Sequence, residues 1–124
     1  MYREAPLGDK SPEDLRKVFA NSMFVCFVYE GSRLVAAGRA LADGADCSYI
    51  CDVAVLQSHQ GMGLGKKVIS HLIEASQGHK KIIICSLPGK EPFYRRFGFL
   101  RVTTAMAIFK NPQQQLESGY SSEE

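Results

Sequence analysis

A glycine-rich stretch lies between a segment typical of a buried strand and one typical of an amphipathic helix. Its sequence is Gln60-Gly61-Met62-Gly63-Leu64-Gly65-Lys66, preceded by the mostly apolar residues 50–55 and followed by helically spaced apolar residues in 66–74. A glycine turn lets the backbone approach a ligand closely, and the first N–H groups of the following helix point at an anion. The stretch therefore predicts a phosphate-binding helix start, whose positive sign Lys66 and Lys67 reinforce.

The spacing of the glycines excludes two well-known nucleotide loops. A P-loop has four residues between its glycines and then Lys and Ser or Thr, whereas three residues separate Gly61 from Gly65 and Lys67 follows Lys66. A Gly-x-Gly-x-x-Gly dinucleotide fingerprint would need a glycine at position 66. A glycine-rich turn without a ligand stays the alternative, because such a string alone is a weak signal.

Length and composition are typical of one globular domain. The chain has 124 residues, 45% of them hydrophobic, and a net charge of +2. We expect a single domain over residues 1–110 and a mobile tail over residues 111–124, which are rich in Gln, Ser and Glu. The charge is too small and dispersed to indicate a nucleic-acid partner, and no apolar run is long enough to span a membrane. We therefore expect neither a nucleic acid nor a membrane as a partner. Because the N-terminus has no apolar run of signal-peptide length, we also expect a cytoplasmic location.

The cysteines do not form a metal-binding pattern. Cys26, Cys47, Cys51 and Cys85 include no Cys-x-x-Cys pair, and the three histidines do not complete a zinc site. We expect reduced thiols and no metal.

Cap and turn signals divide the chain into alternating elements. Ser11 and Pro12 start a helix that ends near Asn21. We then expect strands at 23–29, 33–40 and 48–56, a helix from the glycine stretch to about 76, a strand at 81–86, a short helix at 91–97 and a final strand at 99–109. Antiparallel strands followed by a parallel β-α-β unit with a right-handed crossover give an α/β (α+β) fold, a mixed sheet with helices on both faces.

A second segment lies about 30 residues downstream and reads Phe93-Tyr94-Arg95-Arg96-Phe97-Gly98-Phe99. By itself, its aromatic spacing fits ordinary core packing. Together, Gln-x-x-Gly-x-Gly at 60, 63 and 65 and Phe-Tyr-x-x-x-Gly-Phe resemble the GNAT (Gcn5-related N-acetyltransferase) family. The resemblance covers roughly residues 11–109 and implies a GNAT-like acyl-CoA N-acyltransferase fold that takes acetyl-CoA (coenzyme A) as cosubstrate.

The resemblance also implies roles for individual residues. Residues 60–66 would hold the pyrophosphate through backbone N–H groups, and Val53, Ala54 and Val55 would offer backbone groups to the pantetheine and the thioester carbonyl. Tyr94 would be the general acid that protonates the departing thiolate, which suits a phenol that is protonated at neutral pH.

The general base that deprotonates the acceptor amine is less defined. Asp52, beside the expected thioester position, is the first choice, and a hydrogen-bonded structural acid is an equal alternative for this residue. Water, Tyr49 and His59 are further candidates, although a histidine in a loop is usually exposed.

The short N-terminus departs from the family pattern. Only about ten residues precede Ser11, where family members commonly have a strand, so the opening strand and part of the acceptor-binding lobe look reduced. Residues 23–29 would then be an exposed sheet edge that a homodimer partner could cover.

The sequence supports two functions of different classes. The first is transfer of the acetyl group of acetyl-CoA to a primary amine by direct attack. The second is a catalytically reduced acyl-CoA-binding GNAT-like module with a regulatory or interaction role. The acceptor amine is of unknown identity: a small amine, an antibiotic, an amino acid and a protein lysine all fit.

Overall fold

The computed structural model describes residues 11–123 of the chain. The chain forms two compact units, unit 1 (Met1–Cys85) and unit 2 (Ser86–Glu124). The single domain expected over residues 1–110 stays a prediction. The reduced opening strand expected before Ser11 lies outside the described residues.

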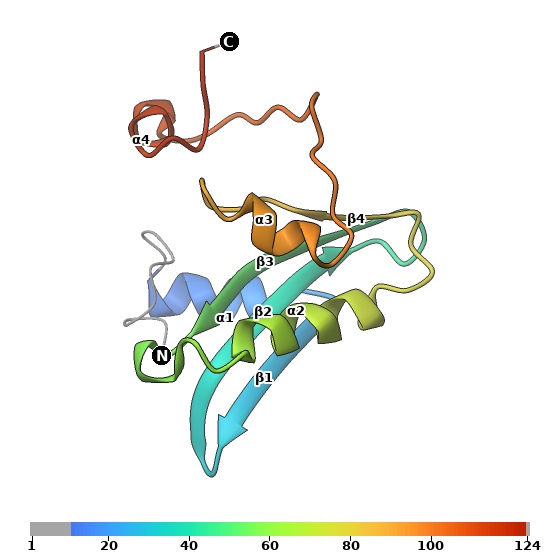
Figure 1. Ribbon diagram of the computed structural model, residues 1–124, viewed down its shortest axis with the longest axis vertical. Coiled ribbons are helices and arrows are strands. Elements are labelled where there is room, and N and C mark those ends of the chain that lie inside the picture. Colours follow the sequence, from blue (N-terminus) through green and yellow to red (C-terminus); the bar gives the residue numbers. More distant parts are fainter. Residues whose placement is uncertain (1–10, 124) are drawn as a thin grey trace. The chain divides into compact units, whose positions relative to one another are not determined.

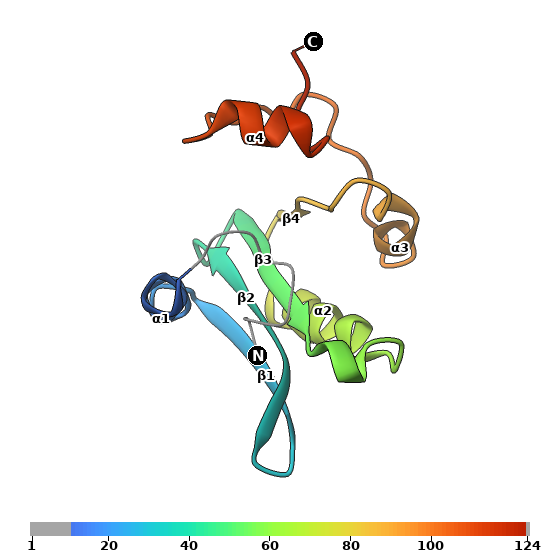
Figure 2. The same ribbon diagram turned by 90° about the vertical axis from the view of Figure 1, so that its left-hand side faces the viewer.

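Unit 1 is a four-stranded mixed sheet flanked by helices (Figure 1). Its elements are α1 (Pro12–Ala20), β1 (Phe24–Glu30), β2 (Arg33–Ala42), β3 (Cys47–Val55), the short 3-10 helix η1 (Gln57–His59), α2 (Leu64–Ala75) and β4 (Lys81–Ile84). The strand order is β1-β2-β3-β4; β2 is antiparallel to β1 and β3, and β4 is parallel to β3. Figure 2 shows α1 and α2 on opposite faces of the sheet. The predicted mixed α/β fold is confirmed.

Local signals explain where α1 begins and how it meets the sheet. The Ser11 hydroxyl accepts the Asp14 N–H at 3.1 Å, and Pro12 takes the first helical position. At the other end, Phe19 stacks on Phe27 of β1 with ring centroids 5.6 Å apart. The helix predicted from Ser11 and Pro12 is therefore confirmed, and an aromatic pair holds it against β1.

The core of unit 1 lies between α2 and the sheet. Helix α2 contacts β1, β2 and β3 and buries Val68, Ile69 and Leu72. A Cβ on Gly38 of β2 would lie 2.7 Å from Val68 Cγ1 and 3.0 Å from Leu72 Cδ1. Glycine at this position is what lets α2 approach the sheet so closely.

Gly38→Ala is expected to lower the free energy of unfolding by about 1–3 kcal/mol, because the added methyl group must displace α2. Gly65→Ala is the matched control, since a Cβ there would meet only Val55 Cγ2, at 3.7 Å. Urea unfolding measures both variants. If Gly38→Ala unfolded with the same free energy as the wild-type chain, the close approach of α2 to β2 would be contradicted.

Strand β1 is at the edge of the described sheet, and three of its apolar side chains are exposed. Val25, Phe27 and Tyr29 are 39%, 44% and 60% exposed. Exposed apolar edge strands readily pair with another chain.

The homodimer expected from the sequence stays a prediction. Light scattering at micromolar concentration should show a dimer for the wild-type chain and a monomer for Val25→Lys, because a charge on the apolar edge disfavours pairing. A monomeric wild-type chain would contradict the homodimer.

Unit 2 contains two short helices, α3 (Glu91–Arg95) and α4 (Pro112–Glu117). The first agrees with the short helix predicted at 91–97. The second lies where the composition predicts a mobile tail. Its start is explained by Asn111, whose side chain accepts the Gln114 N–H at 3.2 Å, followed by proline at the first helical position.

The final strand predicted at 99–109 is wrong. These residues form no strand, and Leu100, Met106 and Ile108 are 82%, 96% and 103% exposed. Alternating apolar side chains describe a surface that fits a sheet, but a strand also needs a neighbour for its backbone hydrogen bonds. Among residues 11–123, no strand pairs with this segment.

Candidate functional site

The glycine loop enters α2 with left-handed backbone at two glycines. Gly61 has φ +83° and Gly63, the residue before α2, has φ +80°, a region that other residues avoid. The first N–H bonded in the helix is that of Lys67, which donates to the Gly63 carbonyl at 3.1 Å. The N–H groups of Leu64 to Lys66 precede it and have no acceptor within the helix. This is the geometry of a helix start that can bind an anion.

The loop is tied directly to the end of β3. Gln60 Nε2 donates a hydrogen bond of 3.2 Å to the Val55 carbonyl. The Met62 side chain, within the loop, is 64% exposed. The predicted cofactor residues 53–55 and 60–66 are thus neighbours in unit 1.

Strand β3 has an open edge next to this loop. Its ladder with β4 covers only its first four residues, while its pairing with β2 continues to its end. The Leu56 N–H donates to the Val35 carbonyl at 2.8 Å, and backbone groups alternate between the two edges of a strand. The N–H and C=O groups of Val53 and Val55 therefore point away from β2, and those of Ala54 point toward it. Within unit 1, the edge presents Val53 and Val55.

A β-bulge interrupts β3 at Asp52. Opposite Gly38 of β2, β3 has two residues, Asp52 and Val53. Asp52 has φ +52°, and among the residues that the structure describes it is the only one other than glycine with a positive φ. Its Oδ2 accepts Arg39 Nε at 2.7 Å, and the two side chains are only 8% and 9% exposed. A hydrogen-bonded structural acid and a general base were the two roles expected for Asp52, and the choice between them stays a prediction.

The structure also places His59 and Tyr49, the other side-chain candidates for the base. The exposure expected for His59 from its loop position is wrong, because only 9% of its surface is exposed. Its Nδ1 lies 2.8 Å from Ser58 Oγ and its Nε2 lies 3.1 Å from Glu30 Oε2. Tyr49 lies within β3, paired to β2 on one side and to β4 on the other.

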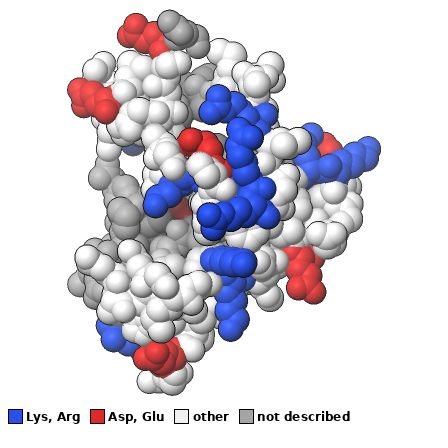
Figure 3. Space-filling view, in the orientation of Figure 1, with Lys and Arg blue, Asp and Glu red and all other residues white. Residues whose placement is uncertain are grey.

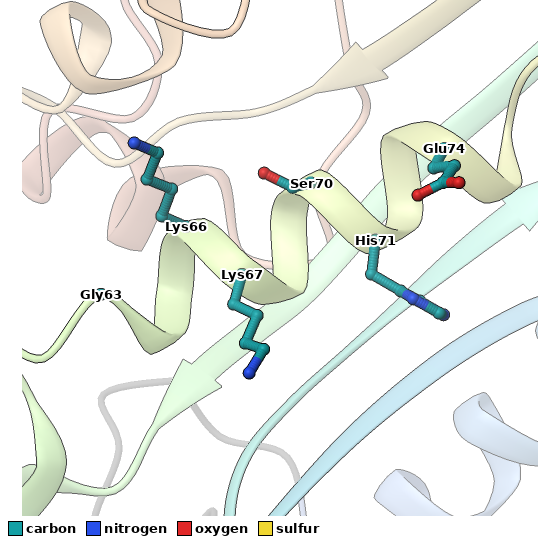
Figure 4. A pocket seen from close by; sticks show the side chains of 6 residues that line it. All are labelled: Gly63, Lys66, Lys67, Ser70, His71 and Glu74. Atoms are coloured by element: carbon teal, nitrogen blue, oxygen red, sulfur yellow. The ribbon is translucent and has the colours of Figure 1, made fainter.

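The outer face of α2 is basic near its start. Lys66 and Lys67 lie in its first turn, and Figure 3 shows basic side chains in this part of unit 1. An open depression of about 440 Å³ on this helix is lined by Gly63, Lys66, Lys67, Ser70, His71 and Glu74. In Figure 4, Lys66 and Lys67 extend from the helix in different directions. This cationic surface adjoins the free N–H groups and favours an anionic ligand.

Tyr94 lies on α3, in unit 2, within an aromatic cluster. Its ring makes edge contacts with Phe93 and Phe99, at centroid distances of 5.1 and 6.2 Å. Burial raises the pKa of the Tyr94 phenol above its usual value of 10.0, because the charged phenolate loses hydration. The side chain both packs, as the aromatic spacing indicates, and keeps its proton, as a general acid requires.

Two classes of feature are absent from residues 11–123. No group of three or more His, Cys, Asp or Glu side chains lies close enough together there to hold a metal ion. No helix in that range is both long and apolar enough to span a membrane.

Solved structures place this fold among acetyltransferases. A probable acetyltransferase of unknown function from meticillin-resistant Staphylococcus aureus has a TM-score of 0.77 at 24% identity, over 88% of this chain and 86% of that one. Glucosamine-6-phosphate N-acetyltransferase from Arabidopsis thaliana has a TM-score of 0.66 at 22% identity, over 84% and 82%.

Residues 2–99 match the acetyltransferase (GNAT) family, and the chain belongs to that family. Serotonin N-acetyltransferase 2, chloroplastic, from Oryza sativa subsp. japonica is 32% identical over 114 residues, which are 85% of this chain and 57% of that protein. GCN5-related N-acetyltransferase 1, chloroplastic, from Arabidopsis thaliana is 44% identical over 75 residues, 58% of this chain and 38% of that protein. The chain spans about half the length of the curated relatives it matches.

Proposed function

We propose that this chain transfers the acetyl group of acetyl-CoA to a primary amine by direct attack, with Tyr94 as the general acid. The observation that carries the proposal is the glycine loop tied to the open edge of β3. It joins helix N–H groups that have no acceptor within the helix to a strand segment that β4 does not pair with.

These residues fit the chemistry of acetyl-CoA. A pyrophosphate is anionic and suits the N–H groups of residues 64–66 and the lysines beside them. The pantetheine arm carries amides that need backbone-type partners. Of the three strand residues expected to supply them, Val53 and Val55 point their backbone groups to the open edge and are the ones we favour.

In the proposed reaction, the amine nitrogen attacks the thioester carbonyl carbon, a C–N bond forms and the C–S bond breaks. Tyr94 gives its phenolic proton to the leaving thiolate and recovers one from solvent. The proton lost by the amine passes to water. A backbone N–H on the open edge of β3 would stabilise the negative charge that develops on the carbonyl oxygen.

For Asp52 we propose a structural role. Protonating its carboxylate during a reaction would leave Arg39, only 7% exposed, as a buried charge without its 2.7 Å partner, which is strongly unfavourable. Water, one of the alternatives left open by the sequence, then accepts the proton of the amine.

Thiol release from acetyl-CoA with a panel of amines tests this proposal. The panel would contain small amines, amino acids, an aminoglycoside and a lysine peptide. We expect turnover with at least one amine and no thiol release without an amine. No turnover with any amine, while coenzyme A still raises the melting temperature, would support the alternative, an acyl-CoA-binding module without catalysis.

The pH profile gives a second check on Tyr94. A general acid must be protonated, and burial raises the pKa of this phenol above 10.0. We therefore expect kcat/KM for acetyl-CoA not to fall as pH rises from about 7 to about 10, the range in which a phenol keeps its proton. Tyr94→Phe is the control, which should lack any decline above that range. A wild-type decline centred well below pH 10 that Tyr94→Phe abolishes would contradict the protonated, buried phenol.

A cytoplasmic location stays a prediction. Two relatives are named as chloroplastic proteins, so similar sequences are found in another compartment.

A further inference from the structure

A partly buried chain of polar contacts links the end of α1 to the bulge in β3. Arg39 of β2 donates from Nε to Asp52 Oδ2 at 2.7 Å and from Nη1 to Ser22 Oγ at 3.3 Å. The Ser22 hydroxyl in turn donates to the Val18 carbonyl of α1 at 2.6 Å. Arg39 is only 7% exposed, and the three hydrogen bonds are partly buried.

A buried ion pair at this position carries a free-energy penalty. Apolar residues of similar volume usually stabilise a protein as well or better, because the two charges lose their hydration. Arg39 is the only charged residue in the stretch Leu34–Leu41. Its partner Asp52 is the bulge residue with φ +52°. The pair therefore fixes the direction of a side chain at the point where the backbone of β3 is left-handed.

We propose that Arg39 is a positioning residue for acetyl transfer. By holding Asp52, it fixes the bulge and so aims the backbone of Val53, the next residue, at the open edge of β3. The inference rests on the proposed function, in which that edge receives the pantetheine and the thioester. The contact with Ser22 anchors the same arginine to α1.

Arg39→Met tests the inference with two ligands. Methionine removes the charge but keeps an unbranched apolar stem. Acetyl-CoA would contact both the glycine loop and the β3 edge, whereas ADP has the pyrophosphate but no pantetheine or thioester. We expect the acetyl-CoA dissociation constant to rise about tenfold, as for the loss of one or two backbone hydrogen bonds, and the ADP dissociation constant to stay unchanged. Titration calorimetry measures both.

Two further variants complete the experiment. Arg33→Met is the matched control, an exposed arginine on the same strand, and should bind both ligands as wild type does. Asp52→Asn serves if Arg39→Met does not fold, because asparagine also adopts left-handed backbone and keeps an acceptor for Arg39. It should raise the acetyl-CoA dissociation constant relative to wild type, by less than tenfold, and leave ADP binding unchanged; wild-type acetyl-CoA affinity in Asp52→Asn would then overturn the inference.

The outcomes separate this inference from the proposed function. Wild-type acetyl-CoA affinity in Arg39→Met, or an equal loss of ADP affinity, would overturn the positioning by Arg39. A wild-type chain that binds neither ligand would overturn the proposed function. Backbone NMR chemical shifts of Asp52 and Val53 report the conformation of the bulge in the absence of a ligand. Arg39→Met should change these shifts, and unchanged shifts would overturn the inference.

Discussion

Tyr94→Phe is expected to lower kcat by about 10²–10⁴-fold, because it removes the proton donor for the leaving thiolate. Phenylalanine keeps the ring that contacts Phe93 and Phe99, so the melting temperature should not change. The affinity for coenzyme A should not change either, since the phenol acts on the departing sulfur during the reaction. Steady-state kinetics with the most active amine of the panel, together with calorimetry, measure these quantities.

Tyr29→Phe is the matched control for this variant. Tyr29 lies on β1 with 60% of its surface exposed, so the loss of its hydroxyl should leave kcat at the wild-type value. A wild-type kcat in Tyr94→Phe would show that another group protonates the thiolate. Equal losses of kcat in the two variants would show that the effect is not specific to Tyr94.

Gly63→Val is expected to weaken coenzyme A binding about tenfold or more. Valine at φ +80° is strained by about 1–2 kcal/mol, and tenfold in affinity corresponds to about 1.4 kcal/mol. The free loop can relieve this strain by leaving the left-handed conformation, which redirects the N–H groups of residues 64–66. Binding must then restore the strained loop. Titration calorimetry with coenzyme A measures the loss.

Gly78→Val separates binding from backbone strain. Gly78 follows the other end of α2, with φ +95° and no atom within 4 Å of an added Cβ. It should lose stability as Gly63→Val does, but keep the wild-type affinity for coenzyme A. Wild-type affinity in Gly63→Val, or the same loss in Gly78→Val, would contradict a ligand held by the glycine loop.

Much of unit 1 could be predicted because its signals are local. Ser11 and Pro12 mark the start of α1, and the glycine stretch marks the turn between a strand and α2. The family could also be predicted, since two motifs stand in the right order, and the match over residues 2–99 confirms it. Such features depend on neighbours in sequence and need no knowledge of the packing.

The features that sequence reasoning missed depend on contacts between distant residues. The bulge at Asp52 arises from a one-residue mismatch between β2 and β3, and the partner that holds it, Arg39, is 13 positions away. One signal was available: Arg39 is a lone charge in an apolar strand, where an unpaired arginine is rarely buried. Similarly, the alternation in 99–109 indicates a strand but cannot supply the neighbouring strand that it needs.

Transfer of an isotopic label tests the central claim most directly. The full chain is incubated with the active amine and acetyl-CoA deuterated in its acetyl group, and the amine is analysed by mass spectrometry. The account predicts that the deuterated acetyl group appears on the amine nitrogen in step with thiol release, and that Tyr94→Phe slows both equally. Thiol release without label on the amine would contradict acetyl transfer by this chain.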